Sequence, residues 1–544
     1  MLSIAVSSFS TEVREMSGDD TLFVREATGL VRDWSSYDAG IYAFLSVNIV
    51  TLGFYIWTFN AFIPQGSPIL ATLIAVVALT LQNLVYATLV ASMPRVGGDY
   101  VWQSRLLSGF WGFFLSWPGW VFILWLWVPI YGSILSWLVL GPVSALFGFV
   151  ELANFWNSSL GLFVSSMIVV AFVFVYVSLG MKWYARIQQA LFYVGVLGLL
   201  IFIGGLLTTS PSQFQTAFNT QMDAWGMAGT SYNGIIQGTS VSFAPLWNLN
   251  WGASYKLFPM LLFWIMWTVW GSTLFGEVRE AGEVKKMFGV FEGALLAAAG
   301  LAIVLWPLFD AAVGYTFYQA LNYNYFVGAG AQQWLSAPTT IAAIAMGNGV
   351  LAKLMAILMG GWFFAWSGTV FLSSTRVIFA TAFDRTIPEV FSEVRGRYNT
   401  PLNAILLMAI PAAILTVIYF FAPGFQTLTL AATFAIAVTF FGTTIACMLF
   451  PWRRPELFSK NPVSKYEVAG VPVISIVAGV YAAILLSVFY LWATESVYGL
   501  NNLRSMGFLG VLYLLSAILY VGMKYYRAQE GVDLDTLHAE IPKD

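Results

Sequence analysis

The chain has 544 residues, of which 59% are hydrophobic and 9% charged, whereas soluble domains carry about 25% charged residues. So much apolar surface requires a lipid bilayer as its solvent. The net charge of −2 offers no basic surface for nucleic acid, and a single Cys and a single His exclude an internal disulfide framework, a Cys-based metal site and any centre that needs several His.

Residues 1–38 are polar, and we expect them to form a cytoplasmic N-terminal tail. The first ten residues lack the basic region that begins a secretory signal peptide. A second methionine, Met16, is an alternative start of translation that the intact mass of the native protein would test.

The first apolar segment, Ala39–Phe62, is uncharged and long enough to cross a bilayer as a helix. Its centre carries Asn48, Thr51 and Gly53, which a lipid-facing anchor does not need. Two interpretations fit these residues alone. The side chains hydrogen-bond and pack against a neighbouring helix, or the helix breaks there and frees backbone groups to bind a solute.

Eleven further apolar segments follow, too long for the strands of a β-barrel and without strict alternation. The twelve expected helices are Ala39–Phe62, Pro68–Met93, Gly109–Leu140, Leu160–Leu179, Ile187–Leu207, Leu257–Phe275, Phe288–Tyr318, Leu351–Phe379, Pro401–Phe421, Leu428–Phe450, Val471–Trp492 and Met506–Tyr526. We group them into a first repeat (39–207), an inverted second repeat (257–450) and two C-terminal helices (471–526), with an extracellular loop at 208–256 and a cytoplasmic tail at 527–544.

The connections show which side each helix end faces. With the N-terminus inside, 21 of the 24 Lys and Arg residues fall on the cytoplasmic side and three on the outside. This asymmetry predicts an even number of spans with both termini in the cytoplasm, because positive loops stay inside.

Four of the cytoplasmic connections carry Gly, Pro and charged residues that suit chain reversal and ion pairing between helix ends. In chain order they are Pro94–Arg105 (PRVGGDYVWQSR), the pair Gly276–Arg279 and Gly282–Lys285 (GEVR, GEVK), Ser374–Pro401 (beginning STRVIFATAFDRTIP) and Pro451–Phe458 (PWRRPELF). As a set, they resemble the APC (amino acid–polyamine–organocation) superfamily, and within it the amino acid permeases, over roughly residues 22–528. The resemblance implies an all-α, polytopic membrane protein with a five-plus-five inverted repeat (LeuT-like) plus two C-terminal helices.

For the first helix, the resemblance favours the substrate-binding interpretation. In such permeases this helix unwinds at a glycine-containing step whose backbone amides take the substrate carboxylate, and free N–H groups at a helix start suit an anion. The matching residues here are Asn48, Ile49, Val50, Thr51, Leu52 and Gly53. A single glycine remains in this stretch, so the Thr51 hydroxyl is an additional candidate donor.

The sixth helix is expected to supply the facing half of the site. The duplicated GEV motif leaves two registers, one with a break near Phe263–Trp267, which we prefer, and one near Val269–Thr273. The candidate substrate-binding residues are Phe263, Trp264, Trp267 and Trp270, because aromatic faces cover aliphatic and cationic groups well. Each Trp alone is equally well explained by packing.

The coupling ion is harder to assign. Ser373 and Ser374 of the eighth helix match positions where sodium-coupled relatives use hydroxyls, although each could instead bond back to its own helix. Asp310 is an acidic residue well inside an apolar run, which makes it a functional candidate or a hydrated residue at the mouth.

The resulting prediction is a secondary active transporter of an amino acid or related amine, working by alternating access in the cell membrane, with no cofactor beyond a co-transported proton or Na⁺. In this hypothesis helices one, two, six and seven rock against the others. A neutral, hydrophobic substrate is favoured because the expected cavity helices lack an acidic residue to pair with a cationic side chain. The alternatives are an exchanger and a transporter-like sensor that binds without flux; an enzyme is disfavoured, because no nucleophile–base set is visible.

Overall fold

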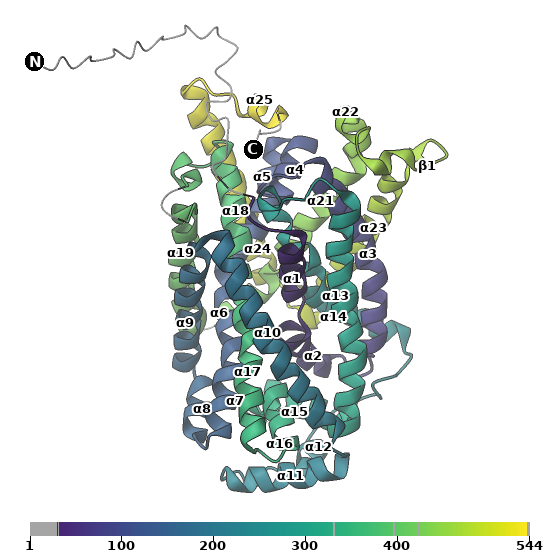
Figure 1. Ribbon diagram of the computed structural model, residues 1–544, viewed down its shortest axis with the longest axis vertical. Coiled ribbons are helices and arrows are strands. Elements are labelled where there is room, and N and C mark those ends of the chain that lie inside the picture. The colour runs from purple at the N-terminus through teal and green to yellow at the C-terminus, as the bar shows by residue number, and fades with distance from the viewer. Residues whose placement is uncertain (1–29, 31, 330–331, 395–397, 423, 541–544) are drawn as a thin grey trace, which may run out of the picture.

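A computed structural model describes residues 30, 32–329, 332–394, 398–422 and 424–540. Within them, twelve helices are long and apolar enough to cross a membrane, as the sequence predicts. They pack into an elongated bundle (Figure 1). The helix α25 lies at one end, here the tail end, and α11, α12, α15 and α16 lie at the other, the loop end. Met16 lies outside the described residues.

The first five spans and their connections include four π- or 3₁₀-helical segments, η1 to η4. Their elements are α1 (Ser36–Ser46), η1 (Ile49–Gly53), α2 (Phe54–Thr58), η2 (Phe59–Phe62), α3 (Pro68–Ser92), α4 (Asp99–Leu106), α5 (Gly109–Trp117), η3 (Pro118–Phe122), α6 (Ile123–Leu135), η4 (Ser136–Leu140), α7 (Gly141–Leu146), α8 (Val150–Trp156), α9 (Ser159–Ser178) and α10 (Gly180–Leu207). The third span, α5 to α7, runs from Gly109 to Leu146, six residues beyond its predicted end.

The second block, like the first, begins with a span whose helix is irregular at its centre. Its elements are α11 (Pro211–Ala224), α12 (Tyr232–Gln237), α13 (Trp251–Ile265), η5 (Met266–Glu277), α14 (Val284–Val313), α15 (Tyr315–Phe326), η6 (Gln333–Ser336), α16 (Pro338–Ala345), α17 (Val350–Ser367), α18 (Thr369–Phe383), η7 (Glu389–Ser392), α19 (Leu402–Phe421), α20 (Phe425–Ala432) and α21 (Phe434–Arg453). The connection at 208–256, expected as an extracellular loop, thus contains α11, α12 and the first residues of α13.

The chain ends with a short hairpin, two spans and a docked helix. These elements are α22 (Pro455–Phe458), η8 (Pro462–Lys465), β1 (Glu467–Val468), β2 (Val471–Pro472), α23 (Val473–Thr494), η9 (Ser496–Tyr498), α24 (Leu503–Gln529) and α25 (Leu534–Ala539). The strands β1 and β2 pair antiparallel.

The seventh span ends five residues before its predicted end at Tyr318. Gly314 has a φ of 92°, a conformation that suits glycine, and its N–H donates to the Asp310 carbonyl. The side chain of Asp310 then accepts from the N–H of Tyr315 at 2.7 Å, at the start of α15. The chain turns between α14 and α15 because these two bonds satisfy a carbonyl at the end of α14 and an N–H at the start of α15.

Candidate functional site

The first span is broken at its centre. α1 ends at Ser46, and a π-turn at Ile49–Gly53 follows before α2 begins. The Asn48 amide spans the break: its Nδ2 donates to the Leu45 carbonyl at 2.8 Å, and its Oδ1 accepts from the Thr51 N–H at 2.7 Å and the Thr51 hydroxyl at 2.6 Å. The hydroxyl of Thr51 is therefore engaged by Asn48 in this conformation.

The sixth span changes at Met266 from α-helix to 3₁₀-helix, inside the preferred register of Phe263–Trp267. The carbonyls near both breaks are capped by side chains from other helices. Trp264 Nε1 donates to the Val47 carbonyl at 2.8 Å, and Gln82 Nε2 donates to the Met266 carbonyl at 2.8 Å. These bonds hold irregular backbone inside the bundle, where water is not available to satisfy it.

A pocket lies between the two broken spans and the third and eighth spans. It is lined by Ser46, Leu52, Tyr55, Ile56, Trp127, Ile130, Tyr131, Ile134, Phe263, Trp267, Trp270, Trp366 and Thr369. Its cavity of about 30 Å³ has room for about two water molecules, so the aromatic walls must separate before an amino acid can enter. All of the lining side chains are uncharged.

The walls of the pocket are stacked aromatic rings. Trp270 contacts Trp267 with ring centroids 5.1 Å apart and stacks on Trp127 at 6.0 Å. A second aromatic pair, Tyr131 and Trp366, stacks with ring centroids 3.9 Å apart. Such a chamber suits an apolar or aromatic side chain, and the hydroxyls of Ser46, Tyr131 and Thr369 supply a small polar rim.

The predicted substrate-binding residues divide into two groups. Leu52, Phe263, Trp267 and Trp270 line the pocket. The others are buried around the breaks and do not line it; they are Asn48, Ile49, Val50, Thr51, Gly53 and Trp264. Behind the pocket, Gly53 lies so close to the Trp264 ring that a Cβ there would be 3.0 Å from Trp264 Cε2.

Sequence reasoning missed the pocket residues of the third and eighth spans. Trp127 and Tyr131 are separated by four positions and therefore share one face of α6. The same spacing was visible in the sequence, but it does not show which neighbour that face meets. Trp366 and Thr369 flank Gly368, where α17 ends and α18 begins.

The candidate ion-coupling residues occupy three separate settings. The Ser373 hydroxyl contacts the Tyr42 hydroxyl at 2.8 Å and donates to the Trp270 carbonyl at 3.1 Å. The Ser374 hydroxyl donates back to Val370 of its own helix at 2.9 Å. Asp310 caps the start of α15 near the loop end.

Two buried ion pairs join helices toward the tail end. Arg376 Nε donates to Glu277 Oε1 at 2.7 Å, and both side chains are almost fully buried. This pair agrees with the ion pairing between helix ends that the GEVR motif predicts. The second pair joins Arg105 Nη2 to Asp384 Oδ1 at 2.7 Å and connects α4 to the end of α18.

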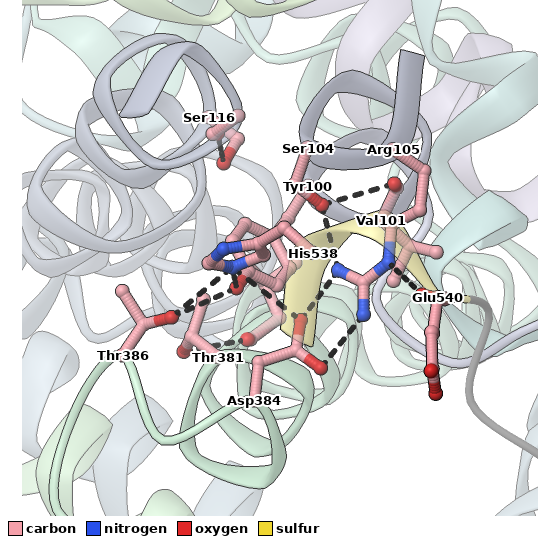
Figure 2. Close-up of polar contacts among 12 residues, drawn as sticks. Tyr100, Val101, Ser104, Arg105, Ser116, Thr381, Asp384, Thr386, His538 and Glu540 are labelled. Carbon is pink, nitrogen blue, oxygen red and sulfur yellow. Dashed lines mark hydrogen bonds and ion pairs between the residues drawn. The ribbon is translucent and has the colours of Figure 1, made fainter. Parts of the chain in front are cut away.

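The C-terminal helix α25 closes over the second pair (Figure 2). His538 is 3% exposed, and its Nε2 lies 3.0 Å from the Tyr100 hydroxyl and 3.4 Å from Thr386 Oγ1. The Glu540 carbonyl accepts from Arg105 Nε at 3.2 Å. The tail of the chain thus covers the Arg105–Asp384 pair.

Burial shifts the pKa values of the titratable side chains at this closure. Desolvation lowers the pKa of His538 to about 4, and the nearby Asp384 opposes this shift only in part. Burial alone would raise the pKa of Asp384, but the Arg105 guanidinium outweighs it and holds the pKa below its ordinary value. At neutral pH the closure therefore consists of an ionised pair and a neutral imidazole.

Comparison with known proteins agrees with this architecture. The sequence model of a protein family described as Amino acid permease matches residues 42–504, which include both helix breaks and the pocket. Among curated proteins, none matches the chain significantly. The chain therefore belongs to the amino acid permease family of the APC superfamily, and it is a multi-pass membrane transporter of amino acids.

Proposed function

We propose that this protein is a secondary active transporter that carries a neutral amino acid with an apolar or aromatic side chain across the cell membrane, coupled to an ion gradient. The observation that supports this substrate class is the pocket lined by uncharged aromatic side chains between the two broken spans. A cationic side chain would lose its hydration there without gaining an acidic partner, which costs several kcal/mol by order of magnitude.

Alternating access would move the first, second, sixth and seventh spans against the others. The two tail-end ion pairs support this assignment, because each joins a different part of the chain to α18: Glu277 from the sixth span and Arg105 from α4. Opening of the tail end requires these pairs to separate. The charge asymmetry of the loops supports a cytoplasmic position for the tail end, and the proposal includes cytoplasmic termini.

Uptake of labelled neutral amino acids into proteoliposomes, with and without a Na⁺ or proton gradient, tests this proposal. We expect saturable uptake that unlabelled aromatic and branched amino acids inhibit, and that lysine and putrescine do not. Uptake of polyamines alone would overturn the substrate class. Binding without flux would identify a sensor, and flux only against internal substrate would identify an exchanger.

A matched pair of variants connects the pocket to the transport. Trp267→Leu removes a pocket wall, whereas Trp452→Leu changes a Trp that is 58% exposed and far along the chain from the pocket. We expect the first variant to weaken substrate affinity at least tenfold and the second to behave as the wild type. Equal affinities in the two variants would show that the pocket does not bind the substrate.

A further inference from the structure

The carboxylate of Asp99 is buried and has no cationic partner among the described residues. Asp99 is the first residue of α4 and is fully shielded from solvent. Its Oδ1 accepts from the Tyr86 hydroxyl and from Thr443 Oγ1, each at 2.5 Å, and its Oδ2 accepts from Trp120 Nε1 at 3.0 Å. All three donors are neutral.

The charged and titratable groups of the elements around α4 are engaged elsewhere. Among the described residues, the buried or partly buried ones are Arg105 with Asp384, Arg376 with Glu277, His538 with Tyr100, Glu292 with Thr80 and Asn83, Tyr481 with Gln82, Cys447 with the Val85 carbonyl, and Arg454 with the Arg105 and Ala539 carbonyls. Arg453 of α21 and Asp535 of α25 are exposed. Asp99 therefore carries a buried charge that a bound proton would neutralise.

The backbone fixes this carboxylate in place. Gly97 and Gly98 have φ values of 103° and 45°, and the Gly97 N–H donates to the Thr273 carbonyl of the sixth span at 2.9 Å. A Cβ on Gly97 would lie 2.4 Å from the Cβ of Ala380. Glycine is required at this close approach, which seats the start of α4 against η5 and α18.

The donors to Asp99 come from both sides of the proposed movement. Tyr86 belongs to the second span, whereas Trp120 and Thr443 belong to the third and tenth spans. Trp120 also contacts Trp270 of the pocket, with ring centroids 4.3 Å apart. Asp99 thus lies at the junction that must loosen during transport and is one side chain away from the pocket.

We propose that Asp99 is the site at which this transporter binds a coupled proton. The ionised carboxylate accepts strong hydrogen bonds and holds the second span to the third and tenth spans; the protonated carboxyl accepts weaker ones and releases the junction. One proton from the outside adds to one carboxylate oxygen of Asp99 and later leaves to the cytoplasm, so each cycle with a zwitterionic amino acid moves one positive charge inward.

The expected pH range follows from the surroundings of Asp99. Burial raises the pKa of the Asp99 carboxyl to about 6, while the hydrogen bonds from Thr443, Tyr86 and Trp120 limit the rise. A group with this pKa changes its protonation between the two sides of a membrane that carries a moderate pH gradient.

This inference rests on the proposed transport function, and the experiment separates the two. Uptake and counterflow exchange of a labelled neutral amino acid are measured in proteoliposomes between pH 5 and 8, with an imposed proton gradient, for the wild type, Asp99→Asn and Glu292→Gln. Glu292 is the matched control, because it is also a carboxylate hydrogen-bonded by neutral side chains but is only partly buried.

We expect the wild type and Glu292→Gln to accumulate substrate in response to the proton gradient, and Asp99→Asn to lose accumulation at least tenfold and to lose the pH dependence of exchange. Proton-driven accumulation by Asp99→Asn would overturn the inference, as would wild-type uptake that follows Na⁺ alone. The absence of both binding and exchange in the wild type would instead refute the transport function.

Two milder variants keep the test decisive if Asp99→Asn does not fold. Thr443→Val and Tyr86→Phe each remove one donor that stabilises the ionised form, so the carboxyl binds its proton more readily. We expect the pH midpoint of uptake to move upward by about one unit in each variant. A midpoint that stays at the wild-type value in both variants would show that Asp99 does not set the pH dependence.

Discussion

Acidification is expected to release the C-terminal helix from the tail end through His538. The docked imidazole has a pKa of about 4, against an ordinary value of 6.5 that the undocked tail would have. The undocked tail therefore binds more protons between these pH values. Docking is fully stable above about pH 6.5 and weakens as the pH falls toward 4.

The magnitude follows from the size of this shift. Each unit of pKa difference corresponds to about 1.4 kcal/mol, so docking should lose about 3 kcal/mol over the whole window and about 2 kcal/mol by pH 5. The neighbouring Asp384 stays ionised in this range, because Arg105 holds its pKa low. His538 is thus the group at this closure that should titrate in the window.

The assay is the mobility of a spin label at Ala539→Cys, an exposed position on α25, as the pH is lowered from 7.5 to 5. Labelling is specific because Cys447, the only native cysteine, is fully buried. We expect the label to become mobile in the wild-type background and to stay immobile in His538→Gln, which does not titrate. A label of constant mobility in both, or equal release in both, would refute the reasoning.

Two further substitutions test the packing at the break of the first span and the Arg376–Glu277 ion pair. Gly53→Ala places a Cβ 2.4 Å from Ile49 Cδ1 and 3.0 Å from the Trp264 ring, so we expect a loss of about 1–3 kcal/mol in stability and weaker substrate binding, measured by thermal melting and by binding titration. Arg376→Met leaves Glu277 as an unpaired buried charge, which should cost about 3–5 kcal/mol in melting experiments.

Each of these changes has an internal control. Gly40→Ala alters α1 where a Cβ meets no atom within 4 Å, and it should behave as the wild type. Equal effects at Gly40 and Gly53 would contradict the packing argument. Adding Glu277→Gln to Arg376→Met should recover most of the lost stability, because the unpaired charge is removed. A double variant no more stable than the single one would contradict the ion-pair explanation.

A feature of the site was predictable from the sequence where residues close together in the chain produce it. A short run of polar and small residues around Asn48 marked the first break, but it fitted packing against a neighbouring helix equally well until the family resemblance favoured the break. The break at Met266 was located only between two registers, and the position of the GEVR glutamate opposite Arg376 distinguishes them. That Arg376 is the partner of Glu277 could not be predicted from the sequence, because the pair forms only when the sixth and eighth spans pack together.

The sequence by itself determined the twelve spans and, through its loop motifs, the family, because hydrophobic runs and loop charges act over a few neighbouring positions. Only the tertiary structure decided that Trp127 and Trp366 wall the pocket, that Asp99 lies among three neutral donors, and that the single His closes the tail end. These roles arise from contacts between residues far apart in the chain, which local periodicity does not encode.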